Sequence, residues 1–115
     1  MPRRTRRRAA HVAPSIKDRW HTARLRRSQR RFAEAVADCL AIADARDALW
    51  SPIALVDAIQ MELYELAAPE RAIALADRML RDWPAHAQAS EARHLRCAAL
   101  RQIGRGAECA ATPQP

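Results

Sequence analysis

The side chains that could hold a metal ion are scattered along this chain of 115 residues. His94 stands three residues before Cys97, so both could reach one metal ion from the same face of a helix. A structural zinc site needs four ligands, and no second pair with suitable spacing accompanies these two. We therefore expect neither a metal ion nor a cofactor.

The serines give no sign of an enzyme. A nucleophile needs a base within hydrogen-bond reach and donors for the charge that develops in the reaction. The serines instead stand where helix caps or surface residues are expected: Ser15, Ser28, Ser51 and Ser90. Ser51 precedes Pro52, which predicts an N-cap followed by proline at the first helical position. Residues 104–106 lack the strand and further glycines of a phosphate-binding loop, so we expect no catalytic activity.

Helices must position these side chains, and two of them are evident in the sequence. Apolar residues recur every three or four positions after Pro52, and again between Pro69 and Pro84. The first stripe is Val56, Ile59, Leu63 and Leu66, and the second is Ala72, Ile73, Ala76, Met79, Leu80 and Trp83. Such spacing buries one side of a helix. Because their connection is short, the two helices are expected to lie antiparallel and to share these stripes.

Residues 53–86 resemble a tetratricopeptide repeat (TPR), a helical pair found in protein-binding solenoids. Tyr64-Glu65-Leu66, Ala72-Ile73 and Pro84 keep the spacing of that family, with an alanine opening the second helix and a proline twelve residues later. One helical pair cannot bury its own face, so about three are usually stacked. The resemblance therefore implies that neighbouring repeats flank this one.

Two weaker repeats fit those flanking positions. Upstream, a first helix over residues 16–28 precedes residues that match the buried positions of a second helix: Phe32, Ala35, Val36, Cys39 and Ile42. Downstream, a first helix over residues 95–105 ends at Gly104, and a short partner helix follows over residues 105–111. We expect an all-α fold of about five to six helices, in antiparallel pairs stacked as a short TPR-like α-solenoid.

A chain of this length has room for one domain. The helical domain is expected over residues 16–111, between a disordered Arg-rich tail (1–15) and a disordered C-terminus (112–115). Leu, Ile, Val and Phe supply 20 of the 115 residues, about 17%, which is below the roughly 20% under which disorder becomes a concern. The core is therefore expected to be thin, and pairing with a partner or with a second copy of the chain is expected to complete it.

The cysteines point to a reducing compartment. Cys39, Cys97 and Cys109 are odd in number, and the first two fall within predicted helices, where a free cysteine behaves as a small buried apolar residue. We therefore expect a cytoplasmic protein. No run of 18 apolar residues occurs, so no contact with a membrane is expected.

The charge is strongly segregated. Residues 1–31 hold twelve basic residues and one acidic residue, Asp18, for a net charge of +11, whereas residues 32–115 have a net charge of −4. Arginine supplies almost all of the basic charge, and its forked donors suit phosphate or carboxylate groups. The bias toward arginine and alanine also resembles coding in a GC-rich bacterial genome.

Four interpretations of residues 1–15 stay open. The segment could be a solubilising tail with no specific partner, a mitochondrial-type presequence, or a segment that docks on the acidic body of this or another copy. It could also be an arm that binds nucleic acid by releasing counterions. The residues of that arm would be Arg3, Arg4, Arg6, Arg7 and Arg8.

The resemblance also implies where a partner binds. In TPR proteins the first helix of each repeat lines the concave surface, and the same register gives Ala54, Asp57, Met61, Tyr64 and Glu65 in this chain. In the weaker upstream repeat it gives Lys17, Trp20, Arg24 and Arg27. The spacing of Asp57, Met61 and Tyr64 also places them on one face, apart from the first apolar stripe. The alternative is that Met61 and Tyr64 pack on the preceding repeat as core residues.

Two functions follow. The first is a non-catalytic interaction module, a TPR-like adaptor or chaperone-like protein, that holds a peptide or helix of another protein in its concave groove. The alternative is a nucleic-acid-associated protein whose arginine arm binds phosphate while the helical body mediates dimerisation. Phosphate binding weakens steeply with salt, whereas apolar anchoring in a groove does not, so salt separates the two.

Overall fold

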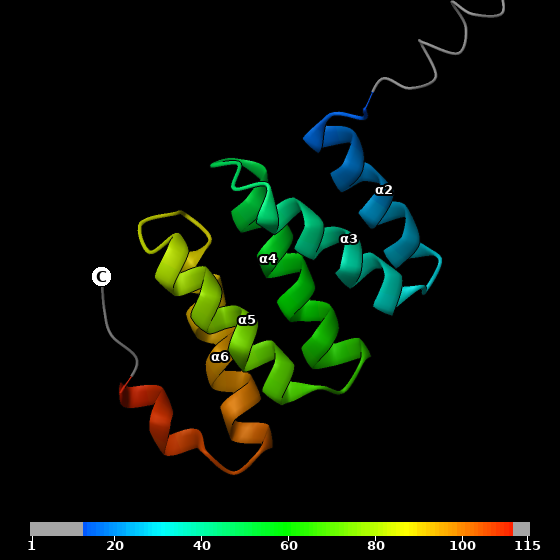
Figure 1. The fold of residues 1–115 in the computed structure, drawn as a ribbon. Helices are drawn as coiled ribbons and strands as arrows, with labels where there is room; N and C mark the ends of the chain where they lie inside the picture. The colour runs from blue at the N-terminus through cyan, green and yellow to red at the C-terminus, as the bar shows by residue number, and fades with distance from the viewer. Residues whose placement is uncertain (1–12, 112–115) are drawn as a thin grey trace, which may run out of the picture.

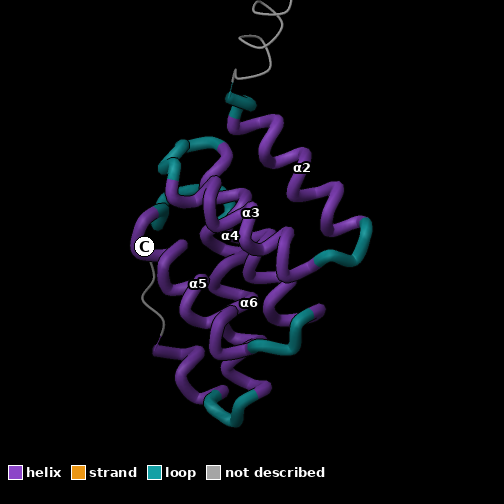
Figure 2. Tube along the Cα trace, turned by 45° about the vertical axis from the view of Figure 1, so that its right-hand side comes forward, coloured by secondary structure: helices purple, strands orange, loops and turns teal. Residues whose placement is uncertain are grey.

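The computed structural model describes residues 13–111, which form helices joined by short loops (Figure 2). The α-helices are α2 (Ile16–Ser28), α3 (Phe32–Asp44), α4 (Trp50–Gln60), α5 (Pro69–Asp82) and α6 (Ala89–Gln102). A π-helical turn, η1 (Met61–Glu65), continues α4, and a 3-10 helix, η2 (Gly106–Ala111), follows α6. No strand occurs in this described range, which confirms the all-α class for it. The arginines of the basic tail lie outside the described residues.

Each helix packs against its neighbours along the chain, and α4 packs against more helices than those beside it in sequence. Helix α2 lies at one end of the stack and η2 at the other (Figure 1). Helix α4 contacts α3 and α5, and it also contacts α2 and α6. Because it is enclosed from several sides, α4 is buried at eight of its eleven residues.

Two clusters of buried side chains form the core. One joins α4, α5 and α6 and includes Leu55, Ile59, Ala76, Met79, Leu95 and Leu100. The other joins α2, α3 and α4 and includes Ala23, Ala35, Cys39, Ile42, Ala54, Ala58 and Met61. Leu40 and Leu75 pack against both clusters, so the core is continuous along the stack.

The predicted stripe of α5 is confirmed over its central turns. Ala72, Ile73, Ala76 and Met79 are buried, and α5 begins at Pro69 as predicted. Ala72 and Ala76 are 0% exposed. Small side chains at these two positions let α5 approach its neighbours closely, which a larger residue would prevent.

Helix α6 begins earlier than predicted, at Ala89 and not at position 95. Buried Ala89 and Ala92 continue the stripe that Leu95 carries, but an alanine methyl group buries little apolar area and gives a weak sequence signal. At the other end, Gly104 adopts a φ of 75°, the left-handed conformation expected of a glycine after a helix.

Ser51 is not the N-cap of α4, and this prediction was wrong. Asp47 takes the capping role, because its Oδ1 accepts hydrogen bonds from the backbone N–H groups of Leu49 (3.0 Å) and Trp50 (2.8 Å). Ser51 is fully buried in the first turn. Its hydroxyl donates to the carbonyl of Ile42 (2.7 Å) and accepts from the backbone N–H of Asp47 (2.7 Å), so it ties α4 to the end of α3.

The end of the α4–η1 segment contains a strained backbone position. The N–H of Leu66 donates to the carbonyl of Met61, and that of Ala68 donates to the carbonyl of Glu62, both at 2.8 Å. Between these two donors, Ala67 has a φ of 51°. This left-handed conformation costs a residue with a Cβ atom about 1–2 kcal/mol.

Ala67→Gly is therefore expected to raise the free energy of unfolding by about 0.5–1 kcal/mol. Glycine removes the backbone strain, but it also raises the conformational entropy of the unfolded chain, which offsets part of the gain. Urea unfolding followed by circular dichroism measures the change. Ala68→Gly is the matched control, since Ala68 has an ordinary φ of −120° and glycine there should lower stability. A67G at or below the wild-type stability contradicts the prediction.

Candidate partner-binding site

Helix α2 is held on α4 by a tryptophan that bonds to a carboxylate. The indole Nε1–H of Trp20 donates to Oδ2 of Asp57 at 3.1 Å. The ring of Trp20 also lies 5.2 Å from that of Trp50, measured between centroids. The guanidinium of Arg24 lies over the ring of Trp20, 5.0 Å from its centroid. A carboxylate, two indoles and a cation therefore gather where α2 meets α4.

A second arginine of α2 reaches the same carboxylate. Nη1 of Arg27 lies 3.7 Å from Oδ1 of Asp57 and donates to Oε1 of Gln60 at 3.3 Å. Arg27 is half-buried, whereas Arg24 is exposed. We call Trp20, Arg24, Arg27, Trp50, Asp57 and Gln60 the α2–α4 cluster. Within this cluster, Arg27 contacts Asp57 and Gln60, whereas Arg24 is exposed to solvent.

Burial dominates the electrostatics of Asp57, which is 9% exposed. Loss of solvent raises the pKa of its carboxyl above the ordinary value of 3.8, and this outweighs the hydrogen bond from Trp20 and the charges of Arg24 and Arg27, which lower it. Burial also raises the pKa of the nearby Cys39 thiol to about 12, and the negative charge of Asp57 adds to that rise. Cys39 is therefore a protonated, unreactive core residue at neutral pH.

Asp57→Asn is expected to change how stability depends on pH. The folded pKa of Asp57 lies above its ordinary value of 3.8, so folding favours the protonated form. The wild type therefore loses stability as the pH rises from about 4 through the folded pKa, and loses no more above it. Asparagine does not titrate, yet its side-chain oxygen can still accept the Trp20 hydrogen bond. The stability of D57N relative to wild type should be higher at pH 7 than at pH 4.

Urea unfolding of both proteins at the two pH values tests this. Glu91→Gln, at an exposed position with no ion pair to another residue in the range 13–111, controls for the loss of one negative charge. If the wild type instead gains on D57N as the pH rises, the attraction of the arginines for Asp57 outweighs its burial, and the assignment is wrong.

The residues expected to contact a partner separate into buried and exposed groups. Ala54 and Met61 are 0% and 1% exposed, inside the cluster formed by α2, α3 and α4, so their side chains offer no surface to a partner. The alternative that Met61 is core therefore holds, but Tyr64 is 59% exposed and is not core. Glu65 is also exposed.

The structure brings four of the predicted residues together: Trp20, Arg24, Arg27 and Asp57. Trp50 and Gln60 complete the cluster but were not predicted. The spacing held a signal for both, because Trp50 stands seven residues before Asp57, and Gln60 three residues after it, which is one helical face. The contact between Trp20 and Trp50 itself joins different helices and has no signature in local spacing.

Other kinds of site receive no support from the part of the chain that the structure describes. Among residues 13–111, no three His, Cys, Asp or Glu side chains lie close enough together to hold a metal ion. No helix in that range is long and apolar enough to cross a membrane. Cys39, Cys97 and Cys109 are free thiols. No family model, curated protein or solved structure matches this chain.

Proposed function

We propose that this chain is a non-catalytic, TPR-like module that holds a peptide or helix of another protein on the side where α2 and α4 meet. The observation that carries the proposal is the exposed guanidinium of Arg24 stacked on Trp20, whose indole is in turn fixed by buried Asp57. The packing of α2 on α4, and of α4 on α6, supports a solenoid in which these three helices share one surface.

The chemistry of this side suits protein recognition. Tryptophan, tyrosine and arginine are the residues that most often dominate binding energy at protein interfaces. Tyr64 stands four residues after Gln60, about one helical turn, so it continues the surface of the α2–α4 cluster. Because hydrogen bonds and stacking already order Trp20, a partner would cost this side chain little further conformational entropy.

A binding role without catalysis fits the polar groups of the cluster. The carboxylate of Asp57 is mostly buried and already engaged, since it accepts a hydrogen bond from Trp20 and lies 3.7 Å from Nη1 of Arg27. Free cysteines fit a reducing compartment, and we place the module in the cytoplasm.

Selection of peptides from a random displayed library, followed by fluorescence anisotropy with the selected peptides, tests the proposal. Arg24→Glu and Tyr64→Ala should each weaken binding at least tenfold, which is about 1.4 kcal/mol. Arg81→Glu is the matched control, since Arg81 is an exposed arginine of α5 away from this side. It should leave affinity within about twofold. Equal losses in R24E and R81E, or selection of no peptide, would refute the proposed site.

A second candidate is nucleic-acid binding by the arginine arm, with the helical body pairing two chains. Its residues Arg3, Arg4, Arg6, Arg7 and Arg8 lie outside the described residues. One observation in the structure favours it: four basic residues that follow the arm in sequence, between positions 17 and 30, make no ion pair with another residue in the range 13–111. These are Lys17, Arg19, Arg24 and Arg30.

The second candidate predicts a steep dependence on salt. Anisotropy of a labelled oligonucleotide should show an affinity that falls sharply between about 50 and 200 mM salt. Deletion of residues 1–12 should abolish that binding and spare the peptide complex. Size-exclusion chromatography with light scattering, at low and high salt, reports whether the helical body forms dimers. Affinity for the oligonucleotide that is unchanged by the deletion would rule out the arm.

A further inference from the structure

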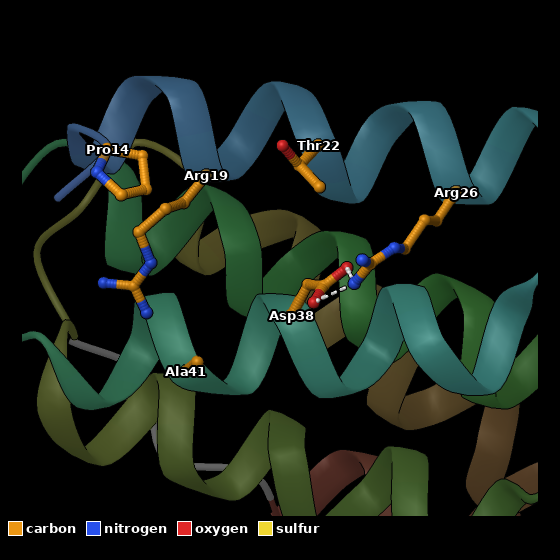
Figure 3. A pocket seen from close by; sticks show the side chains of 6 residues that line it. All are labelled: Pro14, Arg19, Thr22, Arg26, Asp38 and Ala41. Atoms are coloured by element: carbon orange, nitrogen blue, oxygen red, sulfur yellow. Dashed lines mark hydrogen bonds and ion pairs between the residues drawn. The ribbon is translucent and has the colours of Figure 1, made fainter. Parts of the chain in front are cut away.

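An open cleft lined by both charged and apolar side chains lies between α2 and α3, on a different side of α2 from Trp20. It has a volume of about 240 Å³. Its lining residues are Pro14, Arg19, Thr22, Arg26, Asp38 and Ala41 (Figure 3). This volume is below the roughly 300–1,000 Å³ of sites that take drug-sized ligands, so the cleft suits one chemical group.

The only carboxylate in this lining is already neutralised. Both oxygens of Asp38 accept hydrogen bonds from the same nitrogen of Arg26, Nη1, each at 2.7 Å. The remaining N–H donors of Arg26, on Nη2 and Nε, make no hydrogen bond with a residue in the range 13–111. The ion pair therefore holds Arg26 in place and leaves it able to donate to a further acceptor.

Arg19 has no such acidic partner. Its side chain extends from α2 across the cleft toward Ala41 (Figure 3). It is half-buried, and within residues 13–111 it makes no ion pair or side-chain hydrogen bond. A partly desolvated guanidinium with five donors and no acceptor is an arrangement that an anion would stabilise.

We propose that this cleft binds one phosphate-type oxyanion between Arg19 and Arg26. Arg19, Thr22 and Arg26 stand at spacings of three and four residues, so they share one stripe of α2, and the two arginines are about 10 Å apart along its axis. The lining carries a net charge of +1, from two arginines and one aspartate. Arg19 and Arg26 both reach from α2 toward α3, and the carboxylate of Asp38 lies between them, bonded to Arg26 (Figure 3). A change of rotamer would bring the long side chain of Arg19 toward a group placed over Thr22.

The geometry favours a tetrahedral anion over a carboxylate. A carboxylate offers two oxygens in one plane, which matches one guanidinium, as Asp38 already does with Arg26. A group that bridges two guanidiniums from separate helical turns needs oxygens that point in diverging directions, as in phosphate. The hydroxyl of Thr22 donates to the carbonyl of Asp18 at 3.2 Å, and its methyl group faces the cleft (Figure 3), so Thr22 shapes the site and the two arginines supply the donors.

Arginine Nε–H signals in ¹H–¹⁵N NMR spectra of the full chain test this, with sodium phosphate as the probe and sodium chloride at equal ionic strength as the reference. The signals of Arg19 and Arg26 should move along a saturable curve with phosphate and not with chloride. Arg19→Gln should weaken phosphate binding at least tenfold. Lys17→Gln, at an exposed position of the same helix, should leave it within twofold.

Thr22→Glu is a second variant, which tests the same site without removing either arginine. A tethered carboxylate at position 22 would pair with Arg19 and Arg26, so it should abolish the phosphate-dependent shifts while the helix stays folded. Shifts that stay linear in phosphate concentration, that appear equally at all arginines, or that survive both R19Q and T22E would overturn the proposal.

A phosphoserine peptide and its unphosphorylated form distinguish the source of the oxyanion. Tighter saturation by the phosphopeptide than by inorganic phosphate identifies a phosphorylated side chain, and equal affinity identifies free phosphate. Because the cleft shares no residue with the α2–α4 cluster, R19Q should leave unchanged the affinity for selected peptides that depend on Arg24 and Tyr64.

Discussion

Replacing Trp20 by alanine is expected to lower the free energy of unfolding by about 3 kcal/mol and to release α2 from the rest of the protein. Loss of a buried tryptophan typically costs about 3–5 kcal/mol, and Trp20 is half-buried, which places it at the lower end. The variant also leaves Asp57 buried without the donor that it has at 3.1 Å, and an unsatisfied buried acceptor costs about 1–3 kcal/mol.

Urea unfolding gives the size of the change, and hydrogen–deuterium exchange locates it. Exchange in α2 should rise much more than exchange in α5, because the core cluster that joins α4, α5 and α6 does not involve Trp20. Leu25→Ala is the control from the same helix: Leu25 is 56% exposed, so its loss should cost less than about 0.5 kcal/mol. Equal effects of W20A and L25A would mean that α2 is not held by the cluster.

Met61→Ala is the second large effect, an expected loss of about 3 kcal/mol. Met61 is 1% exposed among the side chains of α2, α3 and α4, and truncating a buried methionine typically costs about 2–5 kcal/mol. Tyr64→Ala, only three residues later in the same segment, should change stability by less than about 0.5 kcal/mol, since Tyr64 is 59% exposed.

Met61→Ala and Tyr64→Ala together test which residue of the predicted binding face belongs to the core and which to the surface. Thermal unfolding gives both values, and anisotropy with a selected peptide gives the affinities. Y64A should lose affinity and keep stability. M61A should lose stability, and its affinity should recover once it is measured well below its unfolding temperature. A stable M61A, or a destabilised Y64A, would contradict the burial assigned to these residues.

The face of α4 and η1 that carries Ala54 and Met61 was predicted to be exposed, and it is buried. A helix that is buried on most sides has no single stripe. Once Val56, Ile59 and Leu63 were assigned to the core with α5, the opposite face with Ala54 and Met61 looked free. In the structure that face packs on α2 and α3 as a second cluster. Nothing in local spacing says that a helix has two buried faces.

Helices with strong signals were predicted well, and weak signals failed where small or charged residues carried the packing. Helix α5 combines Pro69 at its start with large apolar residues on one side, and both its start and its stripe were correct. The start of α6 was missed because Ala89 and Ala92 bury little area. Helix α2 was located correctly, but the roles of its arginines depend on Asp38 and Asp57, which belong to other helices.

The most direct test of partner binding between α2 and α4 is photo-crosslinking from position 64. Tyr64 is replaced by p-benzoylphenylalanine and the protein is irradiated with a peptide selected on the wild type. The same replacement at Ala74, an exposed position of α5, is the reference. The account predicts a crosslink from position 64 that Arg24→Glu removes, and none from position 74. Equal crosslinking from both positions, or a bound peptide that crosslinks only from position 74, would contradict it.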